Sequence, residues 1–149
     1  MRPPSDTTLT KLSTRACTVA NGLVDTSVVV DWDDPAVLSE LPDGVAISTI
    51  SMAELAAGPH LAREPMEKAR RQARLQQVES LFDALEFDAS AARSYGQVVA
   101  AVALAGRSHR SRVADLLIAA VARSNKLALY TRNPQDFQGL DALITVVAV

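Results

Sequence analysis

The sequence predicts an α/β protein with a mainly parallel central sheet. Short apolar runs typical of buried strands recur along the chain, and longer stretches with helical periodicity separate them. Strands that alternate with helices are typical of a parallel sheet. We expect the strands at residues 23–24, 45–48, 127–130 and 142–149.

Composition favours one globular domain. The chain has 149 residues, of which 48% are hydrophobic and 21% are charged, as in ordinary folded domains. Residues 1–20 are rich in Thr, Ser and Pro, so we interpret them as a loose N-terminal arm and 21–149 as a single domain. The longest apolar runs fall far short of the roughly 20 residues of a membrane helix. No secretory signal is evident, and the only cysteine, Cys17, excludes an internal disulfide; we therefore expect a cytoplasmic location without membrane association.

Helix signals in the first half follow the strands. Thr26 and Ser27 are good helix-capping residues, which predicts a short helix although three valines follow. Ser51 and Glu54 match a capping box, so a helix is expected to begin at Ser51. The Gly-Pro pair at 58–59 predicts its end or an interruption.

The second half contains three predicted helices. Apolar residues at steps of three and four predict a long helix over 64–85. Asp88 or Ser90 is expected to cap the next helix, which ends at Gly106. Ser111 is expected to cap a further helix that runs to about Ser124. A turn is expected at 133–134. The inner face of the middle helix is expected to carry Ala92, Tyr95, Val99 and Val102.

Acidic side chains lie beside apolar or turn segments in four places. A buried carboxylate is costly unless a positive group pairs with it. Acids from distant parts of a small chain therefore predict a shared cation, and oxygen ligands suit Mg²⁺ or Mn²⁺. Such an ion activates water and stabilises charge on phosphate oxygens. The four acids are Asp25, Glu54, Asp115 and Asp136.

Each acid also has a structural interpretation. Asp25 suits a turn or cap, Glu54 the third position of a capping box, Asp115 a partly exposed first turn, and Asp136 an Asx turn. Position argues for function at Asp25 and Glu54, because both follow strands at the edge of the sheet where ligands bind. Asp115 shares one helix face with apolar residues, which points its carboxylate along the buried stripe.

Basic residues form two clusters. The first, within 63–74, includes Glu64 and Glu67 at helical spacing and is interpreted as a solvated helix face. The second is Arg107, His109, Arg110 and Arg112, which precedes Asp115 and is expected to contact phosphate. The net charge of −2 argues against non-specific nucleic-acid binding by bulk charge. No zinc-type histidine pair, nucleophile elbow or phosphate-binding glycine loop is present in the sequence.

Four short motifs, taken in series, resemble the PIN-domain ribonucleases, specifically the VapC-type toxins of bacterial toxin–antitoxin pairs. They are Val-Asp-Thr-Ser at 24–27, Ser-Thr-Ile-Ser-Met-Ala-Glu-Leu at 48–55, Ala-Asp-Leu-Leu-Ile-Ala-Ala at 114–120 and Thr-Arg-Asn-Pro-Gln-Asp-Phe at 131–137. They span nearly the whole folded part. The resemblance implies a three-layer α/β/α sandwich and Mg²⁺- or Mn²⁺-dependent endonucleolytic cleavage of RNA.

The resemblance also implies roles for individual residues. Asp25 and Asp115 would hold the principal ion, and Glu54 would orient or deprotonate the attacking water. Many relatives have an acid where this chain has Asn133, so either Asn133 or Asp136 completes the site. The implied partners are an RNA substrate, a small antitoxin protein and a second copy of the chain. The residues expected to position the substrate are Thr26, Ser27, Thr131, Asn133, Arg110 and Arg112.

Two alternatives remain open at this point. One is a catalytically silent PIN-like module that binds RNA or protein and uses the acids only to organise the fold. The other is a receiver-like signalling domain with an acidic magnesium site, which would need a lysine at a strand end. Lys126 is the only late lysine and precedes its strand, which ranks the receiver alternative low.

Overall fold

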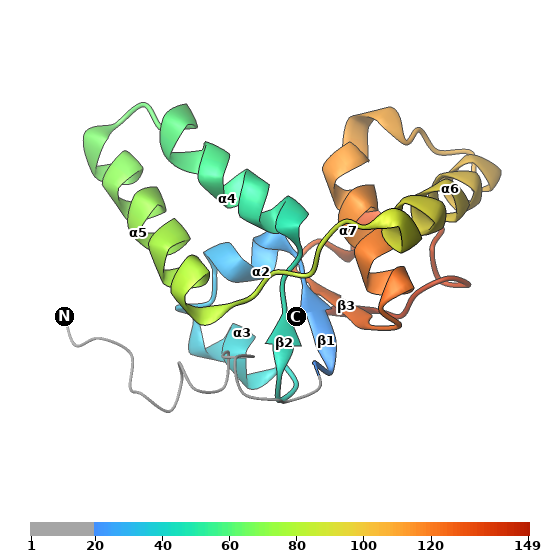
Figure 1. The fold of residues 1–149 in the computed structure, drawn as a ribbon, viewed down its shortest axis with the longest axis horizontal. Helices are drawn as coiled ribbons and strands as arrows, with labels where there is room; N and C mark the ends of the chain where they lie inside the picture. Colours follow the sequence, from blue (N-terminus) through green and yellow to red (C-terminus); the bar gives the residue numbers. More distant parts are fainter. Residues whose placement is uncertain (1–19) are drawn as a thin grey trace.

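The computed structural model describes residues 20–149 (Figure 1). The predicted arm, except Ala20, and Cys17 lie outside the described residues. Four strands form one sheet in the order β2-β1-β3-β4, and every neighbouring pair is parallel. The predicted parallel sheet is confirmed. The strands are β1 (Gly22–Val24), β2 (Val45–Ala46), β3 (Ala128–Thr131) and β4 (Val146–Ala148).

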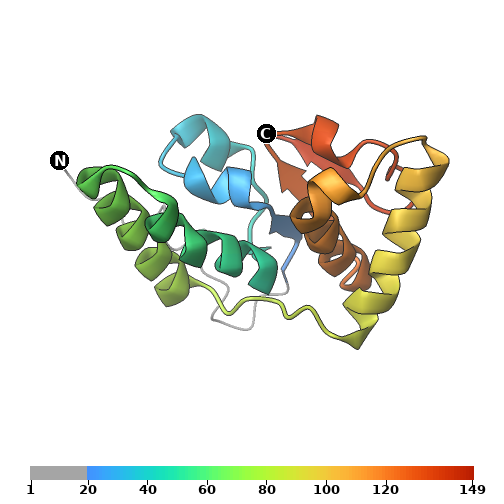
Figure 2. The same cartoon turned by 90° about the horizontal axis from the view of Figure 1, so that it is seen from above.

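Helices cover both faces of this sheet, as the α/β/α prediction requires. Successive strand residues point to opposite faces, so Leu23 and Val24 enter two different cores. Figure 2 shows helical hairpins on opposite sides of the strands. One core includes α6 (Ala89–Leu104) and α7 (Val113–Ser124); the other includes α2 (Thr26–Val30), α3 (Pro35–Ser39), α4 (Thr49–Leu61) and α5 (Pro65–Leu81).

The short helix predicted after the first strand is confirmed, although its cap differs. Asp25, rather than Thr26 or Ser27, caps α2, and its side chain accepts a hydrogen bond from the Val28 amide at 3.3 Å. Val28 and Val29 are buried. Their packing therefore overrides the preference of valine for strands.

The start and end of α4 correct two predictions. Ser48, not Ser51, caps the helix and accepts a hydrogen bond from the Ser51 amide at 3.1 Å, so the capping box is wrong. The strand predicted over 45–48 ends at Ala46, and Ser48 forms only an isolated bridge with Leu85. Pro59 lies inside α4, which continues to Leu61. Pro59 has no amide proton to donate to the Leu55 carbonyl, so α4 lacks one hydrogen bond there, while the proline ring is buried.

The next two helices confirm the predicted order with shifted details. The predicted helix over 64–85 ends at Leu81, and the following residue, Phe82, stacks on Trp32 with ring centroids 5.7 Å apart. Asp88 caps α6 by accepting a hydrogen bond from the Ala91 amide at 2.9 Å. The buried face of α6 confirms Val102 but otherwise lies one residue before the prediction, because alanines and valines occupy several faces of this helix. It consists of Ala91, Ser94, Val98 and Val102.

The last part of the chain is more turn-rich than predicted. Ser111 does not cap α7; the 3-10 helix η1 (Arg110–Arg112) leads directly into it. A second 3-10 helix, η2 (Pro134–Phe137), stands where a turn was predicted. Strand β4 is shorter than 142–149 because Leu140 and Ile144 fold into the core ahead of it. Among residues 20–149, no helix is both long and apolar enough to cross a membrane.

Candidate active site at the carboxyl ends of the strands

Asp25 directly follows β1 and is only 4% exposed. Ser27 Oγ donates to Asp25 Oδ1 at 2.5 Å, and Thr131 Oγ1 donates to Asp25 Oδ2 at 2.7 Å. Burial raises the pKa of Asp25 above its ordinary value, although these hydrogen bonds act in the opposite direction. Both carboxylate oxygens are therefore held in place inside the protein.

The segment after β3 is tied to the same carboxylate. The Asp25 amide donates to the Tyr130 carbonyl at 3.1 Å, which continues the pairing of β1 with β3. The Arg132 amide donates to Ser27 Oγ at 3.1 Å, and the Asn133 amide donates to Thr131 Oγ1 at 3.0 Å. The structure thus brings Ser27 and Thr131 to Asp25, and it fixes the backbone of Asn133 beside them.

Glu54 lies on α4 and is exposed. Thr26 Oγ1 donates to Glu54 Oε1 at 2.6 Å and lies 3.0 Å from Ser51 Oγ, which is fully buried. Because a hydroxyl has one proton to donate, Ser51 supplies the proton of the second hydrogen bond when Thr26 bonds to Glu54. The sequence interpretation assigned Ser51 to a cap and missed this contact. The available signal was a serine one helical turn before Glu54.

Asp115 is half-buried in the first turn of α7. Burial raises its pKa to about 6, together with the negative charges of Asp136, Asp25 and Glu54, while Arg112 partly offsets them. Asp25, Glu54 and Asp136 are therefore near enough to Asp115 for their charges to act on it. Helix α4 contacts α7, and α2 contacts α4 and β3, which gathers their elements at one place.

Arginines fasten the η1 region to η2 beside Asp136. Arg112 Nη1 donates to the Gln135 carbonyl at 2.9 Å and lies 3.7 Å from Asp136 Oδ1. Arg107 hydrogen-bonds Gln138. Arg110 is exposed and forms no ion pair within residues 20–149. Of the two arginines predicted to position phosphate, Arg112 is thus held beside Asp136, and Arg110 faces solvent.

The donor set suits a hard cation that keeps some of its water. Among the described residues, no three His, Cys, Asp or Glu side chains form a finished ion site. The electrostatic coupling of Asp115 to three other acids acts over a longer range than direct coordination. A magnesium-type ion commonly binds one or two carboxylates directly and retains several waters. The residues therefore fit such an ion without all four acids touching it.

A groove of about 460 Å³ adjoins Glu54 between α2 and the α4–α5 hairpin. Glu67 pairs there with Arg70 at 2.6 Å and with Arg71 at 2.9 Å. The interpretation of this basic cluster as a helix face with charge pairs is confirmed at Glu67 and Arg71. Arg74 pairs with Asp33 and its guanidinium carbon lies 5.3 Å from the Trp32 ring centroid.

Comparison with known proteins matches nearly the whole described part of the chain. The PIN domain family model matches residues 22–143. Ribonuclease VapC5 of Mycobacterium tuberculosis is 37% identical over 131 residues, which cover 87% of this chain and 94% of that protein.

Solved structures give a consistent result. A crystal structure of VapBC-5, a member of the VapBC family of toxin–antitoxin systems from Mycobacterium tuberculosis, matches with a TM-score of 0.74 and 34% identity; the match covers 88% of this chain and 98% of that one. The crystal structure of FitAcB from Neisseria gonorrhoeae matches with a TM-score of 0.68 and 30% identity, covering 83% and 94%.

Proposed function

The chain belongs to the PIN-domain family, and we propose that it is an endoribonuclease that serves as the toxin of a toxin–antitoxin pair. The observation that carries this function is the 37% identity with Ribonuclease VapC5 over 94% of that protein's length. The resemblance predicted from the four motifs is thereby confirmed at the level of the family. The acids gathered at one edge of the sheet provide matching chemistry.

Ribonucleases of this family depend on a divalent metal ion, and we infer Mg²⁺ or Mn²⁺ for this chain from its oxygen-only ligands. Asp25 and Asp115 would hold the principal ion. Asp136 would assist through water, with Asn133 as a polar positioning group. When bound, the ion would lower the pKa of its water and stabilise negative charge on phosphate oxygens.

The side chains around the acids have separable tasks. Ser27 and Thr131 fix Asp25, so its carboxylate needs little reorganisation before it binds an ion. Thr26 anchors Glu54 through Oε1, which leaves Oε2 to take the proton of the attacking water. Arg112 stands beside Asp136, where its charge would meet a phosphate that enters the site. Arg110 would contact the RNA backbone at a greater distance from the acids.

The partner surface we propose is the groove beside Glu54 with the adjoining α4–α5 hairpin. The neighbouring VapBC-5 structure is a member of a toxin–antitoxin family, and we infer a small antitoxin partner for this chain. Leu61 is 73% exposed and Met66 is 86% exposed at the turn of the hairpin. These apolar side chains provide contact area for the antitoxin or for a second copy of the chain.

Cleavage of structured RNA with Mg²⁺ or Mn²⁺, and then with chelator, tests this function. We expect cleavage that requires the ion and is lost in Asp25→Asn. The matched control is Asp141→Asn, which removes the charge of an exposed acid and should leave cleavage intact. Cleavage that persists in chelator, or in Asp25→Asn, would overturn the proposed role of the acids. A protein that binds RNA but never cuts it would be the silent module.

A further inference from the structure

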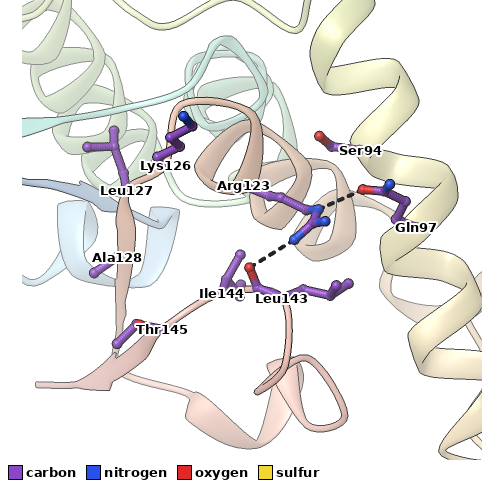
Figure 3. Close-up of a pocket in the computed structure, with 9 residues that line it drawn as sticks. All are labelled: Ser94, Gln97, Arg123, Lys126, Leu127, Ala128, Leu143, Ile144 and Thr145. Atoms are coloured by element: carbon purple, nitrogen blue, oxygen red, sulfur yellow. Dashed lines mark hydrogen bonds between the residues drawn. The ribbon is translucent and has the colours of Figure 1, made fainter.

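A cavity of about 490 Å³ lies at the amino ends of β3 and β4 (Figure 3). The acids lie at the other end of the strands, where the carboxyl ends meet. Ala128, the first residue of β3, lines it, whereas Thr131 at the other end of β3 contacts Asp25. Helix α6, the end of α7 and the segment before β4 form the other walls. The cavity is therefore separate from the proposed active site, and its size falls within the range of about 300–1,000 Å³ typical of small-molecule sites.

The charged residues that line this cavity are all positive. Arg123 and Lys126 line it, no acid does, and neither forms an ion pair within residues 20–149. Arg123 Nε donates to Gln97 Oε1 at 2.7 Å, and Nη1 donates to the Leu143 carbonyl at 3.1 Å. A guanidinium has five N–H groups. Arg123 is thus held rigidly while several of its donors remain available to a ligand.

Ser94 adds a hydroxyl that opens into the cavity without a protein partner. The residue is 8% exposed, yet its hydroxyl makes no hydrogen bond with another described residue, and Figure 3 shows it on the α6 wall of the cavity. Among residues 20–149, no buried side-chain nitrogen or oxygen lacks a hydrogen-bond partner, so the Ser94 hydroxyl is accessible from the cavity. It is therefore free to donate to a ligand or to water there.

Lys126 occupies a backbone position that suits glycine better. Its φ is +56°, and it lies one residue past Asn125, the C-cap of α7. Glycine is the usual residue in this left-handed position because a side chain adds steric cost. Lys126 lines the cavity in spite of that cost, and it is exposed, so its long side chain can bring an ammonium group to a ligand at the mouth of the cavity.

We propose that this cavity binds the phosphate group of a small phosphorylated molecule. A fixed guanidinium, an ammonium and a hydroxyl donor together form a phosphate-recognition set. Leu127 and Ile144 line the same cavity and provide apolar contact for the rest of the molecule. The site is independent of the acids and requires no metal ion.

Titration of the metal-free protein with inorganic phosphate, at constant ionic strength, tests the site by amide NMR shifts. We expect the shifts to centre on Ser94, Lys126 and Leu127. Lys126→Gly should raise the Kd for phosphate by about tenfold or more, while the melting temperature stays equal or rises because glycine suits the backbone there. Ser94→Ala should also weaken binding.

The matched control is Lys68→Gln, which removes one positive charge from an exposed position of α5. It should leave the Kd unchanged. Equal weakening by Lys126→Gly and Lys68→Gln, or shifts that avoid the cavity, would show non-specific attraction and overturn the site. A lower melting temperature for Lys126→Gly with unchanged phosphate binding would reduce Lys126 to a partner of the α7 dipole and also overturn it.

Two sources of phosphate are separated in the same titration. Adenosine monophosphate serves as the small phosphorylated probe, and a 2′-O-methylated oligoribonucleotide, which resists cleavage, serves as the RNA probe. We expect the mononucleotide to shift the cavity amides more strongly than inorganic phosphate does. Shifts caused by the oligonucleotide alone would assign the site to the RNA backbone and overturn the small-molecule proposal.

Discussion

Asp115 has an unfavourable electrostatic environment in the metal-free protein. Its carboxylate is half-buried and close to three other acids, and Arg112 compensates them only in part. A pKa near 6 means that folding makes this carboxyl group harder to ionise than it is in the unfolded chain. The same crowding is the property that a divalent ion would relieve. Asp115 therefore links stability to the proposed activity.

Asp115→Asn should stabilise the metal-free protein and abolish cleavage. The raised pKa corresponds to at most about 3 kcal/mol, which solvent screening at a half-exposed carboxylate reduces to roughly 1 kcal/mol. We expect a rise in melting temperature of a few degrees near neutral pH with chelator present. Thermal unfolding checks this, with Asp141→Asn as control. A lower melting temperature for Asp115→Asn would contradict the account.

Stability of the metal-free protein should fall as pH rises from about 4 to about 6 and then level off. The pKa of Asp115 is raised from 3.8 to about 6 on folding, so within this window the folded state holds a proton that the unfolded state has released. The raised pKa of Asp25 acts in the same direction. Urea unfolding across this range measures the slope, and Asp115→Asn should flatten it. Identical slopes in both proteins would count against the raised pKa.

Thr26→Val should lower kcat by about 10- to 100-fold and leave KM nearly unchanged, as for other side chains that orient a reacting group. Valine keeps the shape of threonine but cannot donate to Glu54 Oε1. Thr26→Ser retains the hydroxyl and should restore most of the activity. Steady-state kinetics on one RNA substrate measure both constants. An equal loss in Thr26→Val and Thr26→Ser would indicate a packing role instead.

At the scale of elements, strand β1 has little room to change at Gly22. A Cβ atom on Gly22 would lie 2.5 Å from Cε2 of the Tyr130 ring on the neighbouring strand. The glycine therefore permits close pairing of β1 with β3, and this pairing sets the position of Asp25 opposite Thr131. In contrast, nothing lies within 4 Å of a Cβ placed on Gly96 in α6.

Gly22→Ala and Gly96→Ala should have opposite effects on the free energy of unfolding. Overpacking against Tyr130 should cost about 1–3 kcal/mol at Gly22. Alanine in the exposed interior of α6 should add about 0.5–1 kcal/mol at Gly96. Urea unfolding of both variants tests the pair. Equal effects of the same sign would mean that the approach of Tyr130 to β1 does not constrain the strand.

The order of the strands and of the longer helices was predictable from the sequence because strand-like apolar runs alternate with helical ones, but the short helix α3 was not predicted. Boundaries were less predictable wherever several residues had similar local properties. Ser48 and Ser51 are both capping types, and in the structure Ser48, whose backbone bridges to Leu85, caps α4. The buried face of α6 was displaced by one residue, because Ala91 and Ala92 have equal local preference and only packing distinguishes them.

At the scale of the whole molecule, parallel topology brings distant motifs together. Strands β1 and β3 are adjacent, so Asp25 meets Thr131, which lies 106 residues later in the chain. This part of the site was predictable, since strand ends in a parallel sheet share an edge. The contact of Arg112 with Asp136 and the basic cavity were not, because both depend on how the end of the chain folds over α7.

Direct measurement of Mn²⁺ binding tests the central claim, that the acids share a divalent ion. Calorimetry or electron paramagnetic resonance near pH 7 would follow the wild type, Asp25→Asn, Asp115→Asn and the control Asp141→Asn. We expect saturable Mn²⁺ binding that is weakened at least about tenfold in Asp25→Asn and Asp115→Asn and unchanged in the control. Equally tight binding by all four proteins would contradict it.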